Sequence, residues 1–247
     1  MSCSTTPGPP RTRSASCWPA CSSSRRPACP PRVCGALPRQ LAAALDGRIA
    51  LSHKATRIEL DGRRWRVSGP GAAVVASHVV VAADPVAAAA LTGQPAPPTH
   101  AVVTDWWAAD EPPSTLPILW VDARPGPPGP VLNTAVISAA APTYAPPGRH
   151  LISASALPAP DGTPPAEEVT RRHAADILGA DGRRWELLAR HVIRHALPAQ
   201  PPPLRVRRPV RLRDGLWWCG DHRDTASIQG ALVSGRRTAE GVLRSAR

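Results

Sequence analysis

The residues best suited to chemistry lie near the C-terminus of the chain. The apolar run Leu216–Cys219 predicts a short buried strand, and Gly220-Asp221 follows it directly. Apolar or small residues then recur with helical spacing from about Ser227 onward, which predicts a C-terminal helix. A strand that ends in Gly-Asp and leads into a helix brings a carboxylate and exposed helix amides to one edge of a sheet. Open α/β sheets bind ligands at such an edge.

This edge has the chemistry of a ligand site. The Asp221 carboxylate suits hydrogen bonds from ribose or ribityl hydroxyls, and a helix cap or loop residue is the alternative. Gly230 and Gly235 leave one side of the predicted helix thin, so that a flat ligand or another backbone can approach closely. His222 is either a substrate-side group or a solvated loop histidine, and we expect the solvated one.

Other constellations of reactive residues are weaker. Segment Trp185–Ala196 has helical spacing, and His191 and His195 lie one turn apart on the helix that it predicts. They lack the glutamate of an H-E-x-x-H motif and a third ligand, so we predict no metal site. Ser227 has no Gly-x-Ser-x-Gly elbow around it, which argues against a hydrolase of that type. The sequence assigns no catalytic acid or base.

The chain carries a formal net charge of +12 over 247 residues. Its densest basic cluster runs from Arg205 to Arg213, where arginines alternate with Val206, Val210 and Leu212. This alternation predicts a half-buried strand with a solvated face. A basic nucleic-acid-binding protein is a hypothesis that rests on charge alone. Because no basic block alternates with aromatic residues, we predict no nucleic-acid partner.

The N-terminal region lacks the signals of a folded or exported segment. Residues 1–33 have no apolar periodicity, which predicts either a disordered segment or a stretch translated out of frame. Five of the six cysteines lie in the first 34 residues, a distribution unlike that of a secreted disulfide scaffold. No apolar run has the length of a membrane span or of a signal-peptide core. We therefore expect a cytoplasmic protein without an integral membrane segment.

Strand and helix signals become regular from residue 34 onward. Ala55–Leu60 and Arg64–Ser68 flank an Asp-Gly pair, which predicts a hairpin. The β-branched run His78–Ala82 predicts a buried parallel strand, and Asp84-Pro85 predicts the start of a helix. Beyond residue 93 the chain is rich in proline and glycine, with strand-like pieces between turns that predict an antiparallel or mixed sheet.

The stretch GLWWCGDHRDTASIQGALVSGRRTAEGVL resembles the closing FAD-binding motif of the flavin amine oxidase, protoporphyrinogen oxidase and phytoene desaturase superfamily. Three earlier stretches resemble successive parts of the same family, and they occur in family order: LPRQLAAAL, then SHKATRIEL with WRV, then HVVVAADPVAAAAL. The resemblance implies an α/β fold. It consists of an incomplete Rossmann-like FAD-binding domain without its N-terminal G-x-G-x-x-G unit, and an α+β substrate domain with a mixed or antiparallel sheet.

The resemblance also implies a division of the chain. Residues 34–92 form a partial FAD-binding domain, residues 93–205 a substrate-type domain, and residues 206–247 return to the FAD-binding domain. The implied cofactor is FAD, and the implied reaction is abstraction of a hydride from a C–H or C–N bond of a small-molecule substrate.

The family pattern assigns cofactor contacts to particular residues. Asp221 would hold the ribityl or pyrophosphate region, and the amides of Ile228 and Gln229 would face the flavin C2 carbonyl. Ala55 falls where the family usually has a valine whose backbone meets the adenine. The same cofactor-binding set includes two glycines of the motif, Gly220 and Gly230.

Two departures from the family pattern qualify this prediction. No G-x-G-x-x-G motif occurs in the chain, so we expect a truncated family member. Lys54 is the only lysine and lies in the adenine-side segment, which favours a carbon-dehydrogenating branch over amine oxidation. The alternative is a non-catalytic remnant or binding domain without flavin. The possible protein partners are a second copy of the chain or a separately supplied N-terminal half.

Overall fold

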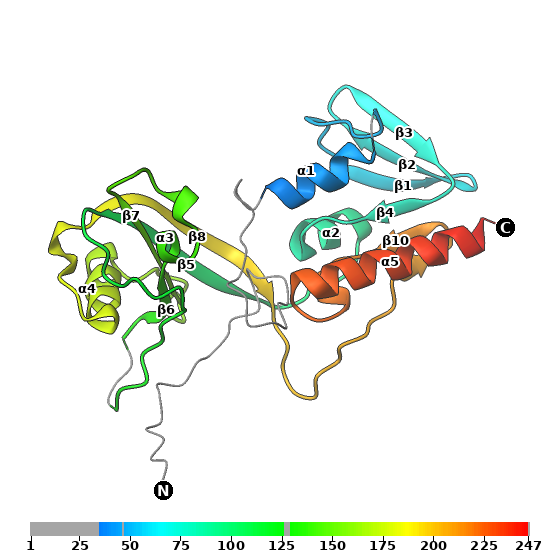
Figure 1. Cartoon of the computed structure of the whole chain (residues 1–247). Helices are drawn as coiled ribbons and strands as arrows, with labels where there is room; N and C mark the ends of the chain where they lie inside the picture. The colour runs from blue at the N-terminus through cyan, green and yellow to red at the C-terminus, as the bar shows by residue number, and fades with distance from the viewer. Residues whose placement is uncertain (1–34, 46, 126–128, 247) are drawn as a thin grey trace, which may run out of the picture. The chain divides into compact units, whose positions relative to one another are not determined.

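The computed structural model describes residues 35–45, 47–125 and 129–246. The described chain has the predicted α/β character, with mixed and antiparallel sheets. It divides into two compact units, each described by itself below. Val102–Ile193 builds one unit, and Pro38–Ala101 together with Arg194–Arg247 builds the other (Figure 1). The interpretation of residues 1–33 as disordered or out of frame lies outside the described residues.

An antiparallel sheet of three strands follows helix α1 (Ala36–Ala43). It contains β1 (Arg57–Asp61), β2 (Arg64–Gly69) and β3 (Ala72–Ala76), and the predicted hairpin between β1 and β2 is confirmed. Its turn glycine, Gly62, has a φ of 62°, a conformation that favours glycine.

A second sheet of three strands has the order β4-β10-β9. Strands β4 (Val79–Val81) and β10 (Leu216–Trp218) run parallel, which confirms the parallel strand predicted near Val80, and β9 (Arg211–Arg213) runs antiparallel to β10. All three residues of β10 are buried, as expected for an uninterrupted apolar run at the centre of a sheet. Trp65 of β2 belongs to the same core, and its indole N–H donates to the Asp214 carbonyl at 2.9 Å.

Each of the two parallel strands leads into a helix with a side-chain cap. The Asp84 carboxylate accepts hydrogen bonds at 3.0 Å from the first amides of α2 (Pro85–Thr92), as the Asp-Pro pair predicts. The Ser227 hydroxyl accepts one at 3.0 Å from the Gly230 amide of α5 (Ile228–Ser245). The C-terminal helix predicted from about Ser227 is therefore confirmed.

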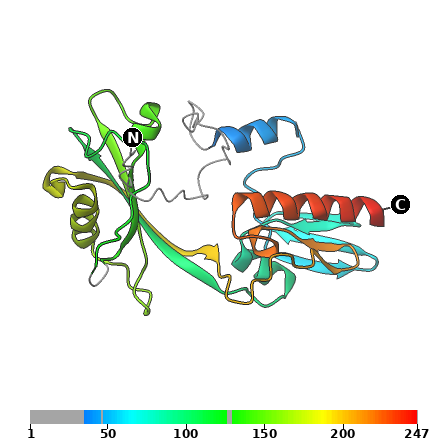
Figure 2. The same cartoon turned by 60° about the horizontal axis from the view of Figure 1, so that its bottom comes forward.

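Helix α5 buries four small residues and exposes its largest apolar ones. It lies along the strands of its unit (Figure 2), and its buried residues are Gly230, Ser234, Thr238 and Gly241. By contrast, Ile228, Leu232 and Leu243 are 59%, 55% and 66% exposed. Small side chains let the helix approach the sheet closely, since a Cβ on Gly241 would lie 2.6 Å from the Trp217 ring.

The other unit is built on a four-stranded sheet with the order β6-β7-β5-β8. Its strands are β5 (Thr99–Ala109), β6 (Val131–Val136), β7 (His150–Ala156) and β8 (Glu186–Pro198). Helix α4 (Glu167–Leu178) packs against β6 and β7, and Trp107 and Ile152 are central in the core between them. The remaining short elements are α3 (Ile137–Ala140) and the 3-10 turns η1 (Pro142–Tyr144), η2 (Gly182–Arg184) and η3 (Asp221–Arg223).

Two segments differ from the sequence-based prediction. Trp185–Ala196 was expected to be a helix, but residues from Glu186 onward form strand β8. Contacts with distant residues decide this outcome, because Trp185 packs against Trp107 at 5.8 Å and Arg190 reaches Asp105 at 3.6 Å. The strand predicted across Arg205–Arg213 is limited to β9, although the Val210 carbonyl also accepts a hydrogen bond from the Trp218 amide of β10 at 2.8 Å.

The close approach of α5 predicts opposite effects for two glycines of the same helix. A Cβ at Gly230 would lie 1.9 Å from the Thr225 carbonyl oxygen, whereas a Cβ at Gly235 would meet nothing within 4 Å. Gly230→Ala should therefore destabilise the protein by about 1–3 kcal/mol through steric strain. Gly235→Ala should stabilise it by up to about 1 kcal/mol through helix propensity. Urea unfolding followed by circular dichroism measures both changes, and equal effects at the two positions would contradict this packing.

Candidate functional site

The candidate site lies at the carboxyl ends of the two parallel strands. Because β4 and β10 pair with Val81 opposite Trp218, the residues that follow them emerge at the same edge of the sheet. Cys219 extends the pairing by donating its amide to the Val81 carbonyl at 3.0 Å. Asp84 follows β4, and Gly220-Asp221 follows β10. The edge therefore has an acid at the end of each strand and a capped helix behind each acid.

Gly220 gives the chain its direction at this edge. Its φ of 152° lies in a region that favours glycine, and a Cβ there would lie 2.5 Å from the His222 ring. The Ser234 hydroxyl accepts a hydrogen bond from the Gly220 amide at 3.0 Å and donates to its carbonyl at 2.8 Å. Helix α5 thus holds the start of the loop through both backbone polar groups of Gly220.

Asp221 keeps a partly accessible carboxylate. Its side chain is 29% exposed, and burial raises its pKa above the usual value for an aspartate, partly offset by backbone hydrogen bonds. The nearest basic atom paired with it is His222 Nδ1 at 3.8 Å, which is too far for a hydrogen bond. The carboxylate can therefore accept hydrogen bonds from hydroxyl groups of a ligand.

The N-terminus of α5 adds backbone donors beside this carboxylate. A helix leaves its first amides without partners inside the helix, and the Ser227 cap takes only that of Gly230. Ile228 and Gln229 are exposed at the helix start. Their amides and the positive end of the helix dipole favour an electron-rich oxygen at this position.

The two remaining residues of the predicted cofactor set have different environments. Gly230 is buried against the carbonyl of Thr225, so its missing side chain makes room for the protein's own backbone. Ala55 is exposed in the coil before β1. No hydrogen bond among the described residues joins it to the Asp221 loop, and its contact with an adenine stays a prediction.

His222 corrects the expectation of a solvated loop histidine. The residue is only 5% exposed, its ring lies 4.7 Å from that of Trp218, and neither ring nitrogen has a hydrogen-bond partner among the described residues. Burial lowers its pKa to about 4, and the positive charges of Arg223 and Arg208 add to this effect, while Asp84 opposes it. Its place directly after the buried strand was the available sequence signal, but the loop's polar composition pointed the other way.

Arginines of helix α5 and of the loop itself hold the loop in place. Arg237 of α5 donates to Asp224 Oδ2 at 3.0 Å and to the carbonyls of Arg208 and Arg223 at 2.7 and 3.3 Å. Arg223 stacks over the Trp218 ring at 4.5 Å, and its Nε is buried without a partner among the described residues. Burial lowers the pKa of Arg223, and the neighbouring arginines lower it further.

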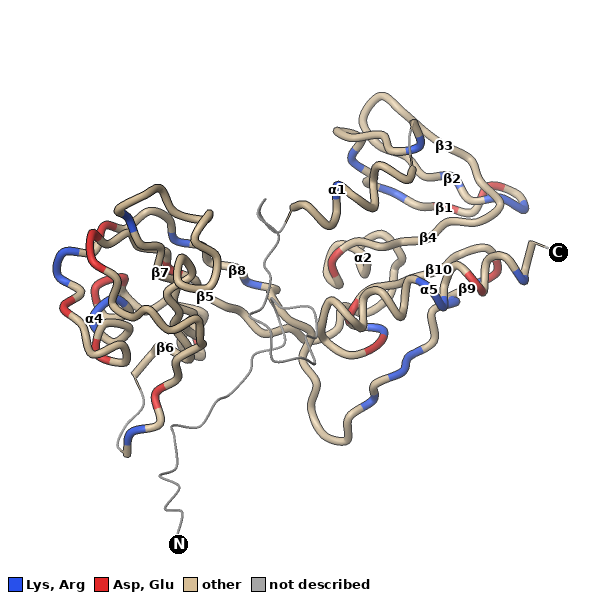
Figure 3. The backbone as a smooth tube through the Cα atoms, viewed as in Figure 1, with Lys and Arg blue, Asp and Glu red and all other residues tan. Residues whose placement is uncertain are grey.

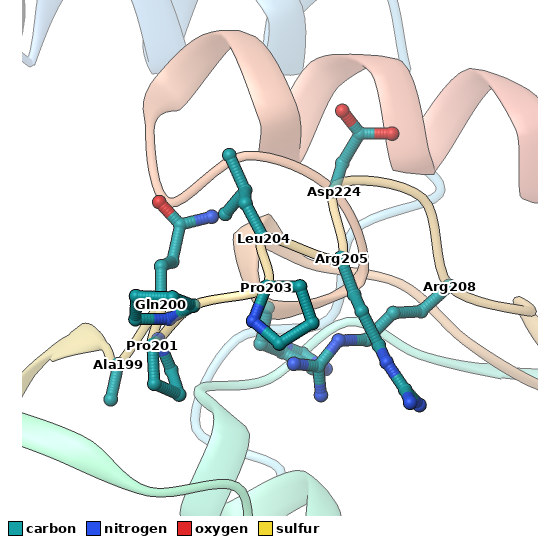
Figure 4. A pocket seen from close by; sticks show the side chains of 10 residues that line it. Ala199, Gln200, Pro201, Pro203, Leu204, Arg205, Arg208 and Asp224 are labelled. Carbon is teal, nitrogen blue, oxygen red and sulfur yellow. The ribbon is translucent and has the colours of Figure 1, made fainter.

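A cavity of about 280 Å³ lies between this loop and the preceding linker. Residues 199–205 and Arg208 form one wall, and His222 and Asp224 form the other. The arginine side chains of the linker extend to one side, whereas the Asp224 carboxylate points away from them (Figure 4).

The described residues contain no group of three or more histidine, cysteine or acidic side chains that could hold a metal ion. His191 and His195 lie on strand β8, and His195 bonds to Thr99 at 2.8 Å. Cys219 is buried, and burial raises the pKa of its thiol. Among the helices of the described chain, none combines the length and apolarity needed to cross a membrane.

The fold and this edge define an α/β protein with a candidate ligand-binding edge at the carboxyl ends of two parallel strands. Residues 9–243 match the family described as flavin containing amine oxidoreductase, so the chain belongs to that family. This confirms the resemblance to the flavin amine oxidase superfamily that the sequence motifs predicted. No curated protein sequence matches the chain.

Solved structures show the same fold. A protein from Exiguobacterium sp. 255-15, provisionally named protoporphyrinogen oxidase, has a TM-score of 0.62 at 16% identity, over 83% of this chain and 50% of that one. An oxidoreductase from Methanosarcina mazei has a TM-score of 0.59 at 16% identity, over 82% and 52%. Putrescine oxidase bound to putrescine has a TM-score of 0.57 at 16% identity, over 83% and 51%. The chain spans about half the length of these proteins.

The buried imidazole predicts a pH-dependent stability. The His222 pKa falls from 6.5 to about 4 on folding, so the unfolded chain binds a proton that the folded chain excludes between these values. The free energy of unfolding should therefore decrease as the pH falls through this window, by up to roughly 3 kcal/mol. The raised pKa of Asp221 acts in the opposite direction at the acidic end.

Urea unfolding at pH 7 and pH 5 tests this dependence. His222→Asn should reduce the difference between the two pH values, because the variant has no imidazole to protonate. His53→Asn, which replaces an exposed histidine of the same unit, should retain it. An unchanged difference in the His222 variant would show that another group causes the effect.

Proposed function

We propose that the chain supplies the flavin-side edge of an FAD-dependent oxidoreductase. The observation that carries this proposal is that two features follow buried strand β10. One is the partly accessible Asp221 carboxylate, and the other is the start of α5, where the amides of the exposed residues Ile228 and Gln229 have no partner inside the helix. In a chain of the flavin containing amine oxidoreductase family, an edge of this kind suits a ribityl chain and a carbonyl of the flavin ring.

The residues of this edge would act by binding and electrostatics. The Asp221 carboxylate accepts hydrogen bonds from ribityl or ribose hydroxyls. The amides of Ile228 and Gln229 donate to the flavin C2 carbonyl, where the helix dipole favours negative charge. A bound flavin supplies hydride acceptance from a C–H or C–N bond of the substrate. Gly220 and Gly230 fix the backbone so that these donors and acceptors lie at one edge.

The substrate is proposed to be a small molecule that loses hydrogen at carbon, as in the phytoene desaturase branch. Lys54 is the only lysine of the sequence, and it is exposed in the coil before β1. Many amine-oxidising members of the family use a lysine beside the flavin, and the position of Lys54 does not support such a role for it. One structural neighbour at 16% identity has putrescine bound. The similarity to that protein concerns the fold and does not assign putrescine to this chain.

A second candidate is a binding domain or remnant that takes up no flavin by itself. The observation that favours it is the absence of a G-x-G-x-x-G motif from the 247 residues, since this motif seats the pyrophosphate of a dinucleotide. A separately supplied N-terminal half would then provide that loop. Titration of the chain with FAD distinguishes the two candidates.

Asp221→Asn should weaken the binding of FAD. Removing the charge of the acceptor weakens hydrogen bonds from ribityl hydroxyls, and we expect a dissociation constant about tenfold higher. The change in the visible flavin spectrum, when a fixed amount of FAD is titrated with the purified chain, measures it. Glu240→Gln is the matched control, because Glu240 is an exposed acid on the outer part of α5 and should leave affinity unchanged.

The outcome separates three cases. Saturable flavin binding that Asp221→Asn weakens and Glu240→Gln does not supports the proposed edge. Equal affinities of the two variants for FAD would contradict the proposed role of Asp221. A wild-type chain that is colourless after incubation with excess FAD and removal of the free cofactor favours the binding-domain candidate.

A further inference from the structure

The cavity beside the Asp221 loop has an excess of positive charge. Among the described residues, neither Arg205 nor Arg208 has a carboxylate within ion-pair distance, although both line the cavity. Asp224, the acid of its wall, is engaged by Arg237 at 3.0 Å. Basic residues follow one another along the segment that leads to β9, with no acid between them (Figure 3). Two guanidinium groups at the cavity are therefore left without a counter-charge.

The wall opposite the linker contains buried polar atoms that lack partners. The His222 side chain is 2% exposed and lines the cavity, and both its ring nitrogens are without a hydrogen bond among the described residues. Buried polar groups are nearly always paired, because an unpaired group loses its hydrogen bonds to water without gaining others. A neutral imidazole offers one N–H donor and one acceptor nitrogen. The cavity thus lacks an acceptor for guanidinium and imidazole donors.

Hydrogen bonds to backbone carbonyls hold the two walls of the cavity together. The Arg208 amide donates to the Arg223 carbonyl at 3.1 Å, and the Arg237 guanidinium donates to the Arg208 carbonyl at 2.7 Å. The three consecutive prolines from Pro201 to Pro203 stiffen the linker. The Arg208 side chain takes part in none of these bonds and can bind a ligand. Because the backbone that carries it is already held in place, binding costs little further conformational entropy.

We propose that this cavity binds an oxyanion, a carboxylate or phosphoryl group, through the Arg205 and Arg208 guanidinium groups and the His222 imidazole. Guanidinium groups donate paired hydrogen bonds to both kinds of oxyanion. Two sources fit the chemistry: the phosphates of a dinucleotide and the carboxylate of a substrate. The site does not require that the chain bind flavin, so it goes beyond the function proposed above.

Calorimetric titration with inorganic pyrophosphate and, separately, with acetate tests the proposal at constant ionic strength. Saturable binding of at least one anion to the wild-type chain is expected. Arg208→Gln should weaken it about tenfold, the loss typical of a hydrogen bond to a charged group, and Arg205→Gln should weaken it too. Arg207→Gln is the matched control, since Arg207 is exposed on the same linker and does not line the cavity.

The results assign the source and decide the proposal. Tighter binding of pyrophosphate supports a phosphoryl ligand, and tighter binding of acetate supports a substrate carboxylate. The proposal is overturned if neither anion binds saturably, or if Arg207→Gln weakens binding as much as Arg208→Gln does. Neither titration contains flavin, so a chain that fails to bind FAD can still bind the oxyanion. The two proposals therefore fail separately.

Discussion

The parallel pairing of β4 with β10 is the constraint on which the candidate site depends. These two short strands lie far apart in the sequence, yet Val81 and Trp218 occupy the same level of the sheet. Their apolar side chains are buried together with Trp65 and α2, so that a shift of the register would expose part of this core. Because the register is fixed, Asp84 and Asp221 emerge at one edge. The edge where a ligand would bind thus follows from the burial of a few apolar residues.

Helix α5 turns this edge into a defined arrangement of polar groups. Its buried face consists of glycine, serine and threonine, which bring the helix close enough for Ser234 to bond both polar groups of Gly220. Larger apolar residues of the same helix are exposed in the described unit. Close packing and polar positioning therefore come from the same small residues. The Ser227 cap adds to this by leaving the first two amides of the helix for a ligand.

The loop after Gly220 contains residues of both proposed binding sites in one short segment. Asp221 offers an acceptor to hydroxyl groups, whereas His222 and the linker arginines offer donors to an oxyanion. Arg237 donates hydrogen bonds to Asp224 and Arg223 of the loop and to the Arg208 carbonyl of the linker. These bonds fix the position of the loop relative to the linker within the unit. Membership of the flavin containing amine oxidoreductase family supports the proposal that a flavin binds on the acceptor side. The donor side has its own chemistry, which the proposed titrations address separately.

The sequence by itself determined the local elements of this protein and the family to which it belongs. Four local features depend only on neighbouring residues and were therefore predictable. They are the Asp-Gly turn, the Asp-Pro helix start, the apolar run of β10 and the C-terminal helix. Only the tertiary structure decided that the segment after Trp185 is a strand, because its pairing and the Trp107 contact come from distant residues. It also decided the burial of His222 and the hydrogen bonds that Arg237 donates to Asp224 and to two carbonyls. Charge and polarity in a sequence predict exposure, but burial depends on which elements pack over a residue, and that is set by contacts far apart along the chain.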